Sequence, residues 1–149
     1  MFKGNKVFLE DRNGRKKQAW FVPFAGFFGF WFLIPAFGLS VKFKGKNSTI
    51  TLGLPLARFS KSKISVGNNS KVEIKSSSDI VKKLKISMAD WQKCTIGRDF
   101  FTWETEIIFS IGKDIEVNIG DDCMFSKGVL IRPSDGHTIY DISTNEILN

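Results

Sequence analysis

The sequence has few of the residues that build disulfide frameworks or metal centres. It contains two cysteines, Cys94 and Cys123, and one histidine, His137. The cysteines are far apart and each lies in an apolar pattern, so we expect two small buried thiols rather than a disulfide framework. One histidine and two distant cysteines do not make a credible zinc set. We therefore expect no metal and, by default, a reducing cytoplasmic location.

Long helical periodicity is also missing. No stretch keeps a helical spacing of apolar residues over more than about three turns. Residues 80–93 come nearest, although their LKISM portion also alternates as a strand would. Short alternating segments bounded by turn residues occur elsewhere, among them 41–45, 48–53, 63–67, 71–75, 106–112, 115–120 and 128–132. This pattern excludes a helical bundle and predicts an all-β chain.

The beginning of the chain lacks the features of a secretory signal. Residues 1–17 carry charges but no apolar stretch with a cleavage site. The chain as a whole has 149 residues, enough for one domain, and a formal net charge of +7. Its lysines come without an RNP motif or zinc-finger spacing, so we expect no nucleic acid partner. An anionic cosubstrate, a glycan or a membrane surface fits the basic charge better.

One uncharged stretch, residues 19–41, is long enough to span a bilayer. Pro23, Pro35, three glycines and an excess of aromatic residues over leucine argue against a span, because aromatic side chains prefer the membrane interface. Three interpretations stay open: an interfacial membrane contact, a buried apolar cap or subunit contact, and a true span. Basic flanks would suit the anionic inner leaflet, which places the protein at the cytoplasmic face of the membrane in the first case.

Near the C-terminus an apolar residue returns every six positions. Ile119, Phe125 and Ile131 take the first place of each six, and Cys123 and Val129 take the fifth. A coil with three flat faces needs a large inward side chain on each face and a small one near each corner, so three sixes make a coil of about 18 residues. Glycine in the second place of a six allows the backbone to turn at a corner without strain. The pattern favours a solenoid; a β-sandwich with chance spacing is the alternative.

The segment VNIGDDCMFSKGVLIRPSDGHTIYD, residues 117–141, resembles the hexapeptide-repeat acyltransferases, particularly the branch of bacterial capsule and O-antigen polysaccharide biosynthesis. The resemblance implies a left-handed parallel β-helix with a C-terminal active-site loop. It also implies an O-acetyltransferase that uses acetyl-CoA, acts on a sugar or lipid-linked glycan and forms a homotrimer. On this basis we expect an N-terminal segment at 1–40 and a β-helix acyltransferase domain at 41–149.

The resemblance gives His137 the role of general base. In the family, a histidine on a loop leaving the β-helix takes the proton of the acceptor hydroxyl as that oxygen attacks the thioester, and the acetyl group passes directly to the acceptor. Cys123 is then a core residue and not a nucleophile. Asp135 and Asp141 are the nearest carboxylates that could orient the imidazole, although Asp135 also suits a turn. Ser134 and Arg132 are candidate contacts to sugar or phosphate.

The sequence departs from the family after this loop. Family members usually resume with further coils that form the channel for the pantetheine arm of CoA, whereas this sequence ends at Asn149. A truncated or split enzyme, or one completed by a partner, is the expectation that follows. The alternative function is a non-catalytic β-solenoid, a fragment or scaffold that docks on a membrane or glycan.

Overall fold

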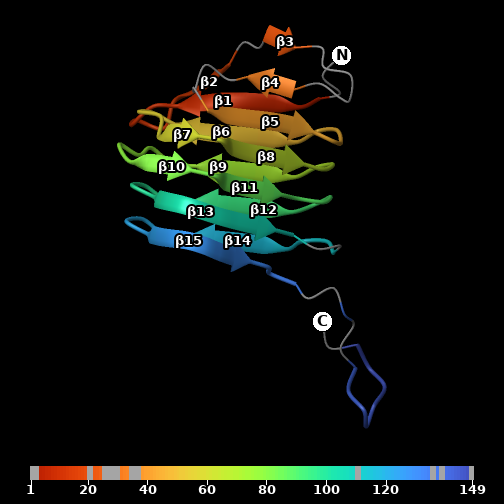
Figure 1. The fold of residues 1–149 in the computed structure, drawn as a ribbon. Coiled ribbons are helices and arrows are strands. Elements are labelled where there is room, and N and C mark those ends of the chain that lie inside the picture. Colours follow the sequence, from red (N-terminus) through yellow and green to blue (C-terminus); the bar gives the residue numbers. More distant parts are fainter. Residues whose placement is uncertain are drawn as a thin grey trace.

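The computed structural model of the chain describes residues 4–19, 22–24, 31–33, 38–109, 112–134, 137 and 140–147. Every helix or strand in these ranges is a β-strand. The strands stack in coils along one axis, from β1 near one end to β14 and β15 at the other (Figure 1). The arrangement is a parallel β-solenoid of about four turns, which confirms the all-β fold and agrees with the left-handed β-helix that the resemblance implies.

One flat face of the solenoid, which we call the β6 face, is a six-stranded sheet. Four of its pairings are parallel, and only β2 runs antiparallel, along β1 at the edge. In sheet order its strands are β14 (Glu116–Ile119), β12 (Lys93–Ile96), β9 (Lys71–Ile74), β6 (Thr49–Gly53), β1 (Lys6–Glu10) and β2 (Lys16–Gln18).

The remaining strands form two further faces that share one sheet. The β5 face holds β5 (Leu39–Phe43), β8 (Ser62–Val66) and β11 (Leu84–Ser87), and the β7 face holds β7 (Arg58–Ser60) and β10 (Ile80–Lys82). Two long strands, β13 (Phe101–Ile108) and β15 (Met124–Ile131), run across both faces. A register shift between Glu104 and Thr105 marks the corner that they turn. The antiparallel strands β3 (Val22–Phe24) and β4 (Trp31–Leu33) extend the sheet beyond β5.

The core is a column of aliphatic side chains stacked from coil to coil. On the β5 face, Val41, Ile64, Ile86, Ile107 and Ile131 are successive partners in register. The first four are fully buried, whereas Ile131 in the last coil is only partly buried. Alternating strands place such residues inside and polar residues outside. The apolar interior therefore continues into the coil that contains β15.

Each coil is longer than six-residue repeats alone require. On the β6 face the in-register partners of Ile50 are Val72 and then Cys94, and hydrogen bonds between adjacent coils join residues 22 positions apart. The additional residues lie in the turns. Asn47, Asn69 and Trp91 take equivalent positions at one corner, with φ of 57°, 50° and 60°. The sequence expectation of an 18-residue coil was therefore too short, because these corners contain left-handed residues outside the six-residue pattern.

The N-terminal segment is partly integrated into the solenoid. β1 pairs in parallel with β6 over its whole length, so a strand from residues 1–40 lies within the β-helix rather than ahead of it. Of the apolar stretch 19–41, the structure describes Ala19, the strands β3 and β4, and residues from Gly38 onward; the rest of that prediction lies outside the described residues. Within the described part of the chain, no helix is long and apolar enough to cross a bilayer.

The six-residue spacing near the C-terminus does point side chains inward. Cys123, Phe125 and Ile131 pack against the core, and the ring of Phe125 meets that of Phe100 edge to face with centroids 5.3 Å apart. Cys94 is fully buried. Both thiols are free, as the sequence predicts.

Candidate functional site

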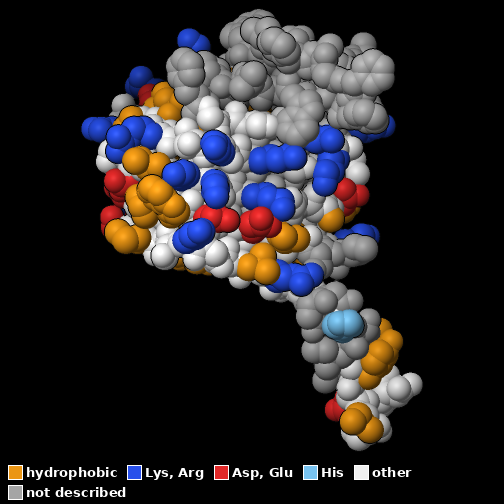
Figure 2. Space-filling view, viewed as in Figure 1, with side chains coloured by type: hydrophobic (Ala, Val, Ile, Leu, Met, Phe, Trp, Pro, Cys, Tyr) orange, Lys and Arg blue, Asp and Glu red, His pale blue; other side chains and the backbone are white. Residues whose placement is uncertain are grey.

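The predicted site residues that the structure describes lie where the chain leaves the solenoid. β15 ends at Ile131, Arg132 follows it as an exposed residue, and Ser134 is half-buried. His137 is exposed, and Figure 2 shows it on a narrow arm that projects from the end of the solenoid. The described residues of this arm are 132–134, 137 and 140–147. The interruption of the six-residue pattern therefore coincides with the end of the last strand, and the only histidine stands outside the packed body.

Asp141 anchors the tip of this arm. Residues Tyr140 and Ile147 form an antiparallel bridge, and the Asp141 carboxylate accepts hydrogen bonds from Ser143 N at 2.7 Å, Ser143 Oγ at 2.5 Å and Thr144 N at 3.2 Å. The Ser143 hydroxyl and these backbone amides lower the pKa of Asp141, because they stabilise its charged form. Its observed contacts are those of a turn anchor. Asp135, the other expected carboxylate, lies outside the described residues.

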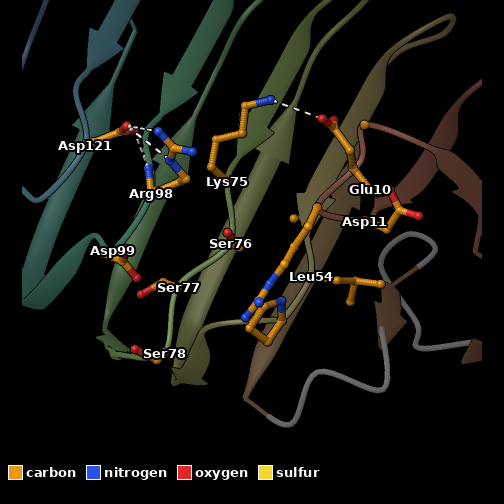
Figure 3. Close-up of a pocket in the computed structure, with 14 residues that line it drawn as sticks. Glu10, Asp11, Leu54, Lys75, Ser76, Ser77, Ser78, Arg98, Asp99 and Asp121 are labelled. Carbon is orange, nitrogen blue, oxygen red and sulfur yellow. Dashed lines mark hydrogen bonds and ion pairs between the residues drawn. The ribbon is translucent and has the colours of Figure 1, made fainter.

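A second candidate site is a polar groove at the corner between the β6 and β7 faces. Its volume is about 710 Å³, and Figure 3 shows its side chains arriving from successive coils. The lining residues are Glu10, Asp11, Arg12, Gly14, Gly53, Leu54, Pro55, Lys75, Ser76, Ser77, Ser78, Arg98, Asp99 and Asp121. Serine hydroxyls and charged groups of both signs can donate and accept hydrogen bonds, so the groove suits a polar ligand rather than an apolar one.

One wall of the groove is fixed by Arg98 and Asp121 from adjacent coils. Asp121 Oδ1 accepts the backbone N–H of Arg98 at 2.7 Å, and Asp121 Oδ2 lies 2.8 Å from Arg98 Nη2. The backbone hydrogen bond and the guanidinium lower the pKa of Asp121. Both side chains are exposed to solvent, so the pair orients the groove wall more than it stabilises the fold.

The other wall carries a second cluster of paired charges. Lys75 Nζ lies 2.5 Å from Glu73 Oε1 and 3.2 Å from Glu10 Oε1, and Lys16 Nζ lies 3.4 Å from Glu10 Oε2. The hydrogen bond from Lys75 is the main cause that lowers the pKa of Glu73, and it raises the pKa of Lys75 in turn. The cluster links the coil of β1 to the coil of β9 across the β6 coil that lies between them.

The sequence did not single out this groove. Its residues come from segments far apart, and the only local sign was the recurrence of Gly followed by polar residues after strands, as at Gly97 and Gly120. Stacking places those turns at one corner. Within the part of the chain that the structure describes, no group of three or more His, Cys, Asp or Glu side chains is placed to hold a metal ion.

Comparison with known proteins gives one informative similarity. The chain is 31% identical over 86 residues to the polysialic acid O-acetyltransferase of Escherichia coli O1:K1 / APEC. The match covers 58% of this chain and 24% of that protein, so the chain aligns with about a quarter of its relative. No family model and no solved structure matches the chain. The similarity and the β-solenoid together fit a hexapeptide-repeat acetyltransferase.

Proposed function

We propose that the chain provides the β-helix and catalytic loop of an O-acetyltransferase of bacterial surface polysaccharide biosynthesis. It would move an acetyl group from acetyl-CoA to a hydroxyl of a sugar or lipid-linked glycan. The observation that carries the proposal is the similarity to a polysialic acid O-acetyltransferase. The parallel solenoid and the SDGH sequence, residues 134–137 just beyond its last strand, support it.

In this proposal His137 is the general base. Its imidazole takes the proton of the acceptor hydroxyl while the oxygen forms a bond to the thioester carbonyl carbon. The carbon–sulfur bond then breaks, and the proton passes to the CoA thiolate as it leaves. Neither thiol is suited to carry the acetyl group, because Cys94 is buried with its pKa raised to about 12 and Cys123 packs against the core.

The proposal includes a homotrimer. His137 stands on an arm outside the solenoid body, and in this proposal a neighbouring subunit contributes a wall to the pocket around it. It also includes a cytoplasmic location, where acetyl-CoA is the donor, with residues 19–41 contacting the inner face of the membrane. Sedimentation of the full chain tests the trimer, and flotation with anionic vesicles tests the membrane contact.

The deciding experiment measures donor binding and transfer separately. Calorimetry with acetyl-CoA requires no knowledge of the acceptor, and release of the CoA thiol in the presence of neutral and acidic oligosaccharides reports transfer. We expect His137→Ala to keep acetyl-CoA binding and to lose transfer by a factor of about 10² or more. Glu146→Gln, an exposed change on the same arm, should leave both unchanged. Transfer retained by His137→Ala would remove this residue from the mechanism.

A non-catalytic solenoid that docks on a glycan is the second candidate. The exposure of His137 on a projecting arm favours it, since a general base normally works in a site that excludes water. A folded protein that binds oligosaccharides but not acetyl-CoA would establish this candidate in place of the enzyme.

A further inference from the structure

The charges of the solenoid are distributed unevenly among its faces. On the β6 face lysines alternate with carboxylates, as in the pairs Lys93–Glu116 and Lys75–Glu73. The β5 and β7 faces and the corner between them carry far more cations than carboxylates. We call these residues the basic surface: its cations are Lys42, Arg58, Lys61, Lys63, Lys82, Lys83, Lys85 and Lys127, and its carboxylates are Glu104 and Glu106.

The basic surface is built by coil stacking. Lys63 and Lys85 are direct partners on β8 and β11, and Glu104 on β13 is the partner of Lys127 on β15. Adjacent strands lie about 4.8 Å apart, so such partners form columns that run along the solenoid axis. Figure 2 shows lysine and arginine side chains spread over several coils, with a few acidic side chains among them.

The two glutamates do not neutralise this surface. Glu104 lies 3.1 Å from Lys83, and Glu106 lies 2.9 Å from Lys85. In each pair the two residues belong to the same column, and the ion pair holds the lysine side chain in place. The surface as a whole keeps more cations than carboxylates. Exposed ion pairs of this kind contribute little to stability. An excess of ordered cations on one side creates a positive potential that attracts a polyanion.

An aromatic side chain lies at the edge of the same surface. Trp103 is 44% exposed, and Lys82 Nζ lies 3.8 Å above the centre of its ring. Lys82 therefore covers one face of the ring, and the rest of the exposed indole offers apolar surface to the CH groups of a sugar, while the lysines meet acidic substituents. Binding of single-stranded nucleic acid uses several aromatic side chains on which successive bases stack, whereas Trp103 is the exposed aromatic among the residues of this surface whose exposure the structure describes.

We propose that the basic surface binds a linear anionic polysaccharide that carries carboxylates along its chain. The surface extends over two faces and several coils, so it suits an extended polymer rather than a small anion. The inference rests on the proposed function and deepens it, since it names an acidic glycan as the acceptor class. The surface would hold the polymer so that one of its hydroxyls can reach the catalytic loop.

The test uses the full chain and polygalacturonate, a polymer with a carboxylate on each sugar, with neutral dextran for comparison. The variant K63Q/K85Q/K127Q removes three exposed cations of the basic surface. The control K6Q/K17Q/K113Q removes three exposed lysines elsewhere and makes the same change in net charge. Circular dichroism confirms that both variants fold.

We expect polygalacturonate to bind and dextran not to bind, with affinity falling as salt rises. The basic-surface variant should bind at least about tenfold more weakly, and the control should stay within about twofold of the unmodified protein. The charge-conserving variant K63R/K85R/K127R should retain binding. Equal losses in both glutamine variants, or no polygalacturonate binding at low salt, would overturn the inference. Tighter binding to oligo-dT or to phosphatidylserine vesicles would overturn it as well.

Acetyl-CoA calorimetry on the same proteins separates this inference from the proposed function. We expect acetyl-CoA to bind the unmodified chain and the basic-surface variant equally. Acetyl-CoA binding without polygalacturonate binding would overturn the acidic acceptor and leave the acetyltransferase standing. Polygalacturonate binding without acetyl-CoA binding would refute the acetyltransferase and, with it, the acceptor role of this surface.

Discussion

A pair of glycines in equivalent corners tests whether the coils stack as tightly as the structure indicates. Gly97 and Gly120 both follow a strand of the β6 face, one coil apart, and neither has a positive φ. A Cβ atom added at Gly97 would lie 2.4 Å from the backbone carbon of Gly120 and 2.5 Å from Asp121 N. At Gly120, in the last coil, an added Cβ atom would meet nothing within 4 Å.

The two alanine substitutions should therefore have opposite effects. Gly97→Ala forces backbone atoms apart and should lower the free energy of unfolding by about 1–3 kcal/mol, the usual cost of overpacking. Gly120→Ala fits without a clash and restricts the unfolded chain, so it should raise that free energy by about 0.4–1 kcal/mol. The chemical change is the same in both proteins, so the difference reports the packing of one coil on the next.

Urea unfolding followed by circular dichroism measures both effects, with the free energy extrapolated linearly to water. A loss of 2 kcal/mol corresponds to a midpoint shift of about 1 M when the denaturant dependence is about 2 kcal/mol per molar. Unchanged stability of Gly97→Ala would refute the tight corner. A loss at Gly120 equal to that at Gly97 would refute the open corner.

Two further predictions concern the thiols and the groove. Cys94 is fully buried and its pKa is raised to about 12, so a thiol reagent at pH 8 should modify the native protein at Cys123 alone. In urea the reagent should modify both thiols. Rapid labelling of Cys94 in the native protein would contradict its burial. Because hydrogen bonds from the Arg98 backbone and guanidinium lower the pKa of Asp121, the folded protein binds fewer protons at this carboxylate than the unfolded protein does. The resulting stabilisation is complete above the ordinary pKa near 3.8 and is lost as pH falls through the lowered pKa of the folded protein. Asp121→Asn should therefore weaken the decrease in stability below about pH 4, measured by urea unfolding against pH. An unchanged acid profile would show that the hydrogen bonds from the Arg98 backbone and guanidinium to Asp121 are not formed.

Much of the fold was contained in local sequence patterns. Alternating segments predicted strands at 63–67 and 71–75, and the structure has β8 and β9 there. The spacing of Phe125 and Ile131 predicted inward side chains because a solenoid repeats the same local environment in each coil. His137 was a candidate from the sequence because it is the only histidine and follows the last repeat. Its role stays a prediction.

Other features could not be deduced before the coils were stacked. The length of a coil depends on corner residues such as Asn69 and Trp91, whose left-handed backbone has no apolar periodicity. The polar groove joins Glu10 to Asp121, residues at opposite ends of the sequence. In the sequence, the lysines are scattered as single residues and short pairs. The sequence by itself determined the strands, the inward pattern and the position of the histidine, because these depend on neighbouring residues. Only the tertiary structure decided which charges share a surface, because the β-helix places residues about 22 positions apart side by side.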